Sequence, residues 1–294
     1  MKLKIVGYLL MIVGLLLPLV LISNMTVHEV REFFAYQSYK KSESGFSQKE
    51  EEVIKHYQEV VRSGQLATVD PFAEAGKEEQ SVADFGDRII GYLSVPSLEI
   101  RQPIRVGASD SHLEQGVAVV SGTDLPFGGL HRRSVLAGHR SWYSDLRFFR
   151  LNEMREGDEI FVEIGEKVVT YRVKNTEIIK ATDWQKLLPI EKQDVLTLLT
   201  CDPLVPPFDY RLLVNAYRYQ DSSEQVAVSE EKTQSSQVVL ETYRKKGLSF
   251  LAYLTFLGWV LFGYLSYKLG RLVRKSGRGG RCRQAKKEKV LSVE

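Results

Sequence analysis

The chain has 294 residues, 44% of them hydrophobic, and a formal net charge of +3. Two long apolar stretches occupy part of this length, so the remainder is enough for one ordinary domain with a single core. Residues 23–247 carry 28 basic and 35 acidic residues, a net −7, and this acidic balance argues against nucleic acid as the main partner of that segment.

Residues 1–24 are predicted to form an N-terminal transmembrane anchor. The 18 positions from Ile5 to Ile22 carry no charge and follow two lysines. A second transmembrane helix is predicted over 248–267, which has 20 uncharged residues and is followed by a basic tail, 268–294. Because Lys and Arg resist translocation, we expect a multi-pass protein of the cell membrane with both termini cytoplasmic and the segment between the spans outside the cell. The tail would lie against the anionic inner leaflet, with nucleic-acid contact as the alternative.

A helical lead and lid segment is predicted over 25–84. Apolar residues recur at spacings of three and four as far as about Arg62, which is typical of amphipathic helices leading out of a membrane. The pattern breaks at Gly64, Asp70 and Pro71, so residues 63–83 are expected to form a loop before the main domain.

Residues 85–220 are predicted to form a mainly β catalytic domain. Short β-type runs bounded by turn residues favour a closed or nearly closed barrel with few helices and one helical piece near 146–154. The runs are 89–95, 104–106, 116–120, 134–137, 159–164, 167–173, 177–179, 195–200 and 211–217. Residues 221–247 are rich in Ser, Glu, Gln and Lys, which predicts a flexible tether to the second span.

The two cysteines fall on opposite sides of the predicted membrane. Cys201 lies in the exported segment and Cys282 in the cytoplasmic tail, so they cannot form an intramolecular disulfide. A lone exported cysteine is either a small buried hydrophobe or a free thiol kept for chemistry.

Cys201 ends a predicted strand, and the next strand opens with Arg211. If the two strands are antiparallel neighbours, the end of one and the start of the other meet at the same edge of the sheet. A guanidinium in this place can lower the pKa of a thiol and bind the oxyanion that forms when an acyl carbon is attacked.

His139 is the candidate proton carrier. It follows an apolar β run and Gly138, whereas His28 and His56 lie in the helical lead and His112 and His131 in polar loops. Taken singly, each of the three residues is more typical of a structural role: a buried cysteine, a hydrogen-bonded histidine, an arginine in a surface ion pair. Their combination in one exported domain favours catalysis.

Other chemistries find little support in the sequence. It contains no H-E-x-x-H pair, no Cys/His cluster with zinc spacing, no G-x-S-x-G elbow and no phosphate-binding glycine loop that opens a helix. The acidic residues show no calcium-loop spacing. We therefore predict neither a metal nor a cofactor.

Three motifs resemble those of the sortase family. Thr197-Leu198-Leu199-Thr200-Cys201 resembles T-L-x-T-C, residues 211–214 resemble R-L-L-V, and residues 137–140 resemble the family's histidine motif. The similarity runs from about Gly91 to Arg218. It implies a closed eight-stranded sortase-type barrel in which Cys201 is the nucleophile, His139 exchanges the proton and Arg211 stabilises the oxyanion.

Within the family, the second span and Asp70-Pro71-Phe72 resemble the pilus-assembling class C enzymes of Gram-positive bacteria, whose lid carries D-P-W or D-P-F. The resemblance implies that Asp70 pairs with Arg211 and that Phe72 lies against Cys201. A plain turn is the alternative for Asp70-Pro71. The sequence departs from the family at Asp202 after the cysteine and at Tyr210 before the arginine, both beside the expected substrate groove.

The resemblance implies a cysteine transpeptidase that cleaves an LPXTG-like sorting signal and joins its Thr carboxyl to an amine. A pilin lysine is the expected acceptor, as in pilus polymerisation, and a cell-wall precursor, as in cell-wall anchoring, is the alternative. A noncatalytic, membrane-tethered assembly or binding protein and a plain cysteine peptidase are the readings from other classes.

Overall fold

The computed structural model describes residues 2–41, 46–68, 70–72, 85–140, 148–219 and 250–291. The chain divides into two compact units, one formed by residues 1–34 and 247–294 and the other by residues 35–246. The predicted tether lies outside the described residues, as does most of the predicted lid loop beyond Phe72.

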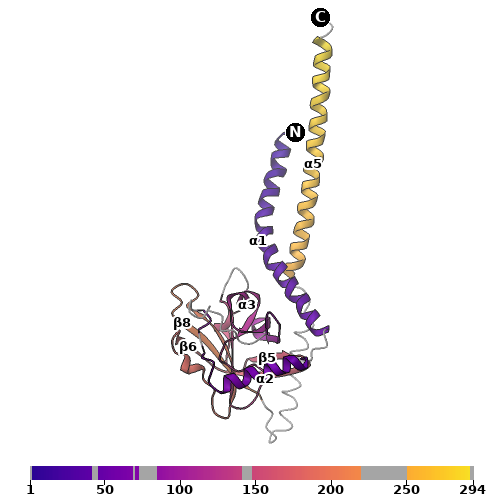
Figure 1. Cartoon of the computed structure of the whole chain (residues 1–294). Helices are drawn as coiled ribbons and strands as arrows, with labels where there is room; N and C mark the ends of the chain where they lie inside the picture. The colour runs from indigo at the N-terminus through magenta and orange to yellow at the C-terminus, as the bar shows by residue number, and fades with distance from the viewer. Residues whose placement is uncertain are drawn as a thin grey trace, which may run out of the picture. The chain divides into compact units, whose positions relative to one another are not determined.

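Eight strands close into a barrel in the larger unit (Figure 1), which confirms the predicted mainly β, closed barrel. Around the barrel the strands follow the order β1-β2-β3-β4-β7-β8-β6-β5. Most neighbours are antiparallel, but β2 pairs with β3 and β4 with β7 in parallel. The strands are β1 (Gly91–Val95), β2 (Ile100–Val106), β3 (Val117–Val119), β4 (Arg132–Ala137), β5 (Glu159–Ile164), β6 (Lys167–Lys180), β7 (Asp194–Asp202) and β8 (Tyr210–Arg218).

Apolar side chains cover both faces of β7, which explains its nearly continuous apolar sequence. Leu196 and Leu198 belong to the main core cluster, and Leu199 belongs to a second cluster. The second cluster also takes Leu113 from α3 (Asp110–Gln115) and Leu187 from η4 (Trp184–Leu187). The centre of β7 is therefore held from two sides, which fixes the strand that carries Cys201 next to its end. The remaining short helices are η2 (Pro96–Leu98) and η3 (Leu151–Glu153).

Strand β6 corrects one expectation from the sequence. The runs 167–173 and 177–179 were expected to be separate, but they form one strand of 14 residues with a register shift between Val173 and Asn175. Lys174, Asn175 and Thr176 are exposed, and this exposed middle gives the strand the polar composition of a turn.

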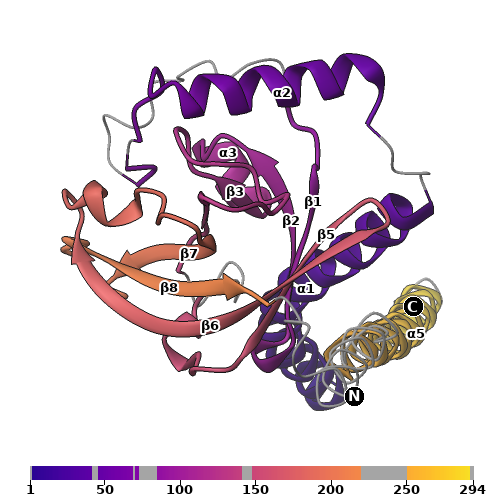
Figure 2. The ribbon, with the colours of Figure 1, turned by 90° about the horizontal axis from the view of Figure 1, so that it is seen from below.

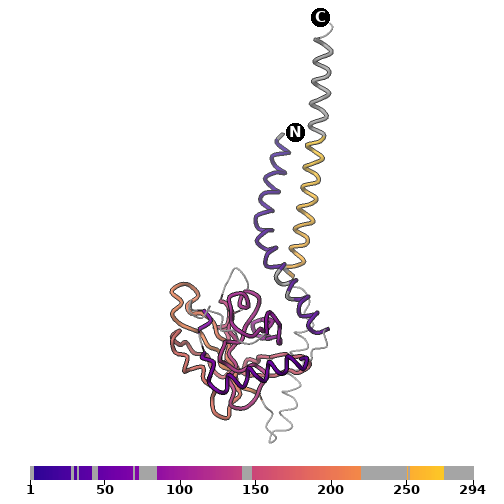
Figure 3. Tube along the Cα trace, in the orientation of Figure 1, coloured from indigo at the N-terminus to yellow at the C-terminus, as the bar shows by residue number. Residues whose placement is uncertain are grey.

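Helix α2 (Gln48–Arg62) runs along the barrel near β1 and α3 (Figure 2), and the path of the chain can be followed in Figure 3. A capping box between Ser47 and Glu50 begins the helix. Its apolar face buries Ile54 and Tyr57, and the Tyr57 hydroxyl donates to the carbonyl of Thr123 at 2.9 Å. This contact holds the predicted helical lead on the barrel, just before the segment that carries Asp70.

Two long helices form the smaller unit. The predicted anchor ends at residue 24 and the predicted second span at residue 267. Helix α1 (Lys2–Lys41) continues past the first of these positions and α5 (Phe250–Leu291) past the second, so neither position is a helix end. In the part of the chain that the structure describes, one helical stretch, Leu3–Val27, is long and apolar enough to cross a membrane. Among the described residues, the apolar half of α5 does not meet the same requirement of length and hydropathy.

The last turns of α1 belong to the barrel unit and contact β5. The Tyr36 hydroxyl donates to the Glu163 carboxylate at 3.1 Å, and the Lys40 ammonium lies 3.5 Å from it. Glu163 is fully buried, and a buried carboxylate needs such partners.

Candidate active site

Three neighbouring strands bring Cys201, His139 and Arg211 to one edge of the barrel. Cys201 and Arg211 are direct partners in the antiparallel ladder of β7 and β8. On the other side of β7, Ala137 of β4 is the parallel partner of Leu199, so continuing the register by two residues sets His139 beside Cys201. The thiol therefore lies between the imidazole and the guanidinium in the order of the strands.

The segment that carries His139 is bonded to β7 through Gly138. The Gly138 N–H donates to the Leu199 carbonyl at 3.1 Å, and the Thr200 hydroxyl donates to the Gly138 carbonyl at 2.7 Å. A Cβ at Gly138 would lie 2.7 Å from a ring carbon of Phe148, closer than real Cβ contacts allow. The site thus requires glycine here, and Thr200 links the strand of Cys201 directly to the segment of His139.

The Arg211 guanidinium is buried and bonded on several sides. Its Nε and Nη2 donate to the two carboxylate oxygens of Asp70 at 3.2 and 2.5 Å, and its Nη1 donates to the carbonyls of Phe208 and Tyr210 at 2.6 and 2.7 Å. The side chains of Arg211 and Asp70 are only 4% and 7% exposed. The donors that an oxyanion would need are therefore engaged by the Asp70 segment and the β7–β8 loop.

Phe72 packs over the same groups. Its ring centroid lies 5.8 Å from that of His139 and 5.4 Å from the Arg211 guanidinium carbon. The Phe72 N–H donates to Asp70 at 3.1 Å, which holds the aromatic ring and the carboxylate in one turn. Residues 70–72 thus contact both neighbours of the thiol, His139 and Arg211. The contact between Asp70 and Arg211 joins positions 141 residues apart in the chain.

Burial raises the pKa of the Cys201 thiol from its ordinary value of 9.0 to about 11. The positive charge of Arg211 lowers this pKa, the carboxylate of Asp70 raises it, and Arg140 lowers it. The thiol is therefore protonated at neutral pH in this closed arrangement. Removing Asp70 and Phe72 from the site would act on the two causes that raise the pKa.

Sequence reasoning did not single out Arg140 and Asp202 as a pair. Arg140 Nη1 donates to Asp202 Oδ1 at 2.5 Å and to the carbonyl of Cys201 at 3.4 Å. Arg140 directly follows His139 and Asp202 directly follows Cys201, so a pairing of the two strand ends is the signal that could have identified them.

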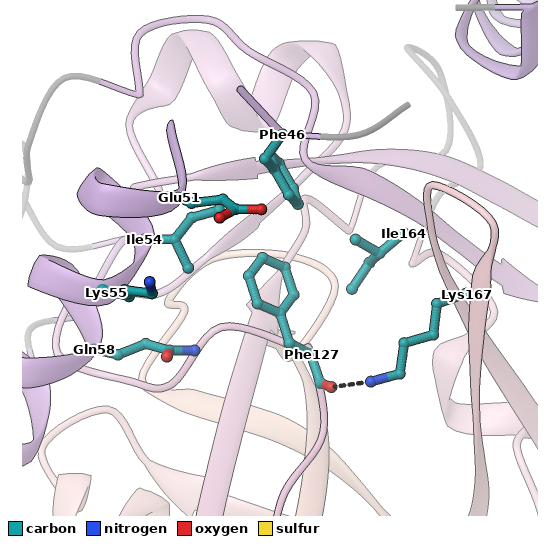
Figure 4. Close-up of a pocket in the computed structure, with 8 residues that line it drawn as sticks. All are labelled: Phe46, Glu51, Ile54, Lys55, Gln58, Phe127, Ile164 and Lys167. Atoms are coloured by element: carbon teal, nitrogen blue, oxygen red, sulfur yellow. Dashed lines mark hydrogen bonds between the residues drawn. The ribbon is translucent and has the colours of Figure 1, made fainter. Parts of the chain in front are cut away.

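A cavity of about 340 Å³ lies elsewhere on the barrel, between α2 and the β5–β6 hairpin (Figure 4). Its apolar lining comes from Phe46, Ile54, Phe127 and Ile164. Among the described residues, its lining includes none of the five predicted site residues. The described part of the chain also has no group of three His, Cys, Asp or Glu side chains that could hold a metal ion.

Comparison with known proteins identifies the family. A model of the sortase domain matches residues 93–219. Sortase C-3 from Streptococcus pneumoniae aligns with a TM-score of 0.56 and 36% identity over 68% of this chain and 98% of that one. Sortase C-1 from the same species aligns with a TM-score of 0.54 and 25% identity over 65% of this chain and 100% of that one.

Sequence relatives agree with this result. Sortase A of Listeria monocytogenes is 23% identical over 68% of this chain and 84% of the relative. Sortase A of Bacillus anthracis is 25% identical over 39% of this chain, and the match spans 52% of that relative's length. The matched domain contains Cys201, His139 and Arg211. The chain belongs to the sortase family, and the solved class C sortases of Streptococcus are its structural relatives.

Proposed function

We propose that the protein is a cysteine transpeptidase in which Cys201 is the nucleophile, His139 the proton carrier and Arg211 the oxyanion stabiliser. The observation that carries this proposal is that Cys201 and Arg211 are ladder partners on β7 and β8, while His139 follows β4 two residues beyond its last pair with β7. A thiol flanked by an imidazole and a guanidinium has the groups that covalent acyl transfer requires.

In the first half-reaction, the Cys201 thiol passes its proton to His139, and Sγ attacks the carbonyl carbon of the scissile peptide bond. Negative charge collects on the carbonyl oxygen, where Arg211 binds it. The C–N bond then breaks, His139 gives a proton to the departing amine, and a thioester with Cys201 remains. In the second half-reaction an acceptor amine attacks the thioester, His139 takes a proton from it, and the thiol leaves as the new amide forms.

The resting protein is a closed form in this proposal. Asp70 occupies the Arg211 donors, Phe72 packs on His139, and burial keeps the thiol protonated. A substrate must displace residues 70–72 before Arg211 can bind an oxyanion, so the segment acts as a lid. This lid keeps the thiol from reacting with unrelated peptides.

The relatives support the proposed class of substrate. Sortase C structures, one of them from a pilus island, share the fold of this chain. They support an LPXTG-like sorting signal as the donor and a pilin lysine as the acceptor, which would make the reaction a step of pilus polymerisation. A cell-wall precursor as the acceptor is the second candidate, supported by the similarity to two proteins named Sortase A.

The proposed setting is the cell membrane, with both termini in the cytoplasm and the barrel outside. Helix α1 supplies the first span. The second span is proposed for the apolar first half of α5, because this part carries small or polar residues where it meets α1, as membrane helices do. The Thr26 and Thr255 hydroxyls lie 2.8 Å apart, and Gly258 sits against Leu19.

The test uses the full-length chain, wild type and Cys201→Ala, with a library of sorting-signal peptides and an acceptor amine. Mass spectrometry is expected to detect a thioacyl adduct on the wild type that passes to the amine, and no adduct on Cys201→Ala. Release of free acid despite abundant amine would instead indicate a peptidase. No adduct, even with Asp70 and Phe72 both replaced by alanine, would support the noncatalytic assembly role.

A further inference from the structure

Arg140 bridges three segments at the edge of the barrel. Its Nη1 reaches the Cys201 carbonyl and the Asp202 carboxylate, and its Nη2 donates to Asn152 Oδ1 at 3.1 Å. Its Nε also donates to the Phe149 carbonyl at 3.5 Å. The Arg140 side chain is only 10% exposed, so its charge is held in place rather than free in solvent.

The bonds of Arg140 join the ends of the strands that carry the proton carrier and the nucleophile. Arg140 is the residue after His139, beyond the end of β4, and Asp202 is the residue after Cys201, at the end of β7. Beyond Ala137 and Leu199 no ladder pair holds β4 to β7. The Arg140–Asp202 pair, together with Thr200 bonded to Gly138, takes over where the ladder stops.

We propose that Arg140 is a positioning residue for Cys201: it holds the ends of β4 and β7 together, and Asp202 tunes how much of its positive charge reaches the sulfur. This inference rests on the proposed thiol chemistry. It adds a second cation to the site, on the opposite side of β7 from Arg211.

Among the residues that the structure describes, the charged and titratable groups that face Cys201 come from four segments of the chain. They are His139 and Arg140 after β4, Asp202 on β7, Arg211 on β8 and Asp70 in the lid. Each arginine is thus paired with a carboxylate, Arg211 with Asp70 and Arg140 with Asp202. Whereas the lid carboxylate leaves when the lid opens, Asp202 is part of β7 and stays. Arg140 is therefore a permanent and partly neutralised cation.

A purely structural ion pair and a charge-tuning pair make different predictions. If the pair only held the strands, loss of either partner would change the thiol in the same direction. If Arg140 acts through its charge, its loss weakens the thiolate, whereas loss of Asp202 releases the full charge of Arg140 and strengthens the thiolate. The sign of the effect separates the two cases.

The experiment measures alkylation of Cys201 by iodoacetamide against pH in the full-length chain, on a Phe72→Ala background that gives the reagent access to the site. Arg140→Gln is expected to raise the midpoint of the profile and Asp202→Asn to lower it, each by about one pH unit, the low end for a charge at close range. At neutral pH, alkylation is then expected to be roughly threefold slower in Arg140→Gln and roughly threefold faster in Asp202→Asn. The change is smaller than the roughly tenfold change in thiolate fraction, because a thiolate of lower pKa is a weaker nucleophile. Arg140→Lys keeps the charge and is expected to keep most of the wild-type midpoint.

Arg150→Gln is the matched control, since it removes the exposed pair of Arg150 with Glu153, whose atoms lie 2.7 Å apart, and is expected to leave the profile unchanged. Midpoints that move in the same direction in both variants, or do not move, overturn the inference. If Arg140→Gln fails to fold, the comparison of Arg140→Lys with Asp202→Asn decides. Opposite shifts of the two midpoints without any ligated peptide would support this inference and contradict the proposed transpeptidation. Ligated peptide without opposite shifts would support transpeptidation and contradict this inference.

Discussion

Opening the proposed lid by mutation should make the Cys201 thiol react faster with an alkylating reagent. In the closed structure, burial raises the pKa of Cys201 to about 11, and the Asp70 carboxylate acts in the same direction. Replacing Asp70 and Phe72 by alanine removes that carboxylate and the ring over His139, so water reaches the thiol and Arg211 loses its carboxylate partner. Both changes favour the thiolate.

The magnitude follows from the thiolate fraction. At pH 7.5 a thiol with a pKa of about 11 is only about 0.03% ionised, whereas one at 9.0 is about 3% ionised, a hundredfold difference. The less basic thiolate is also a weaker nucleophile, with a Brønsted coefficient of about 0.4–0.5, so the expected gain in alkylation rate is about tenfold. Because the pKa is raised in the closed form, the wild-type rate should climb until about pH 11, while the variant should level off near pH 9.

The assay is iodoacetamide alkylation of the full-length chain followed by intact-mass spectrometry across a pH series. Glu156→Ala serves as the control, because it removes an exposed carboxylate from a turn outside the lid. A rate in the Asp70→Ala/Phe72→Ala variant equal to that of wild type, with the same pH profile, would refute the lid and the explanation of the thiol's protonation.

Three further changes test the framework around the site. Gly138→Ala should destabilise the barrel by about 1–3 kcal/mol in chemical denaturation, because the new methyl group meets the buried Phe148 ring, and adding Phe148→Leu should recover part of the loss. Glu163→Ala should cost about 2–4 kcal/mol, since it leaves the buried Tyr36 hydroxyl without the carboxylate, and an effect below 0.5 kcal/mol, about that of an exposed site, would contradict this. Tyr57→Phe removes one hydrogen bond and should lower the unfolding free energy by about 1 kcal/mol while alkylation of the thiol stays unchanged.

The strands of the barrel could largely be predicted because their sequences alternate or run apolar between turn residues. The exception was β6, where three exposed polar residues in the middle of a long strand have the composition of a turn. Only the pairing with β8, which continues on both sides of the bulge, reveals a single strand. The side-chain pattern alone does not carry that information.

The contacts of the candidate site could be predicted where they join residues close together in the sequence, and less well where they join distant ones. Cys201 and Arg211 belong to strands joined by a short loop, so antiparallel pairing predicts that they meet. His139 reaches Cys201 through a parallel pair whose strands lie about 60 residues apart, and neither composition nor spacing gives that register. Motif resemblance was needed for His139 and for the pairing of Asp70 with Arg211. Asp202 was recognised only as a departure, and its partner Arg140 became evident once the strand ends were in place.

The burial of Cys201 also bears on how fast its thiol is oxidised. Oxidation to sulfenic acid begins from the thiolate, so a thiol held in its protonated form reacts slowly with peroxide. The proposed lid at residues 70–72 would therefore slow the oxidation of Cys201 as well as control the access of substrate. In the proposed extracellular setting, the thiol would meet oxidants only while a substrate holds the lid open.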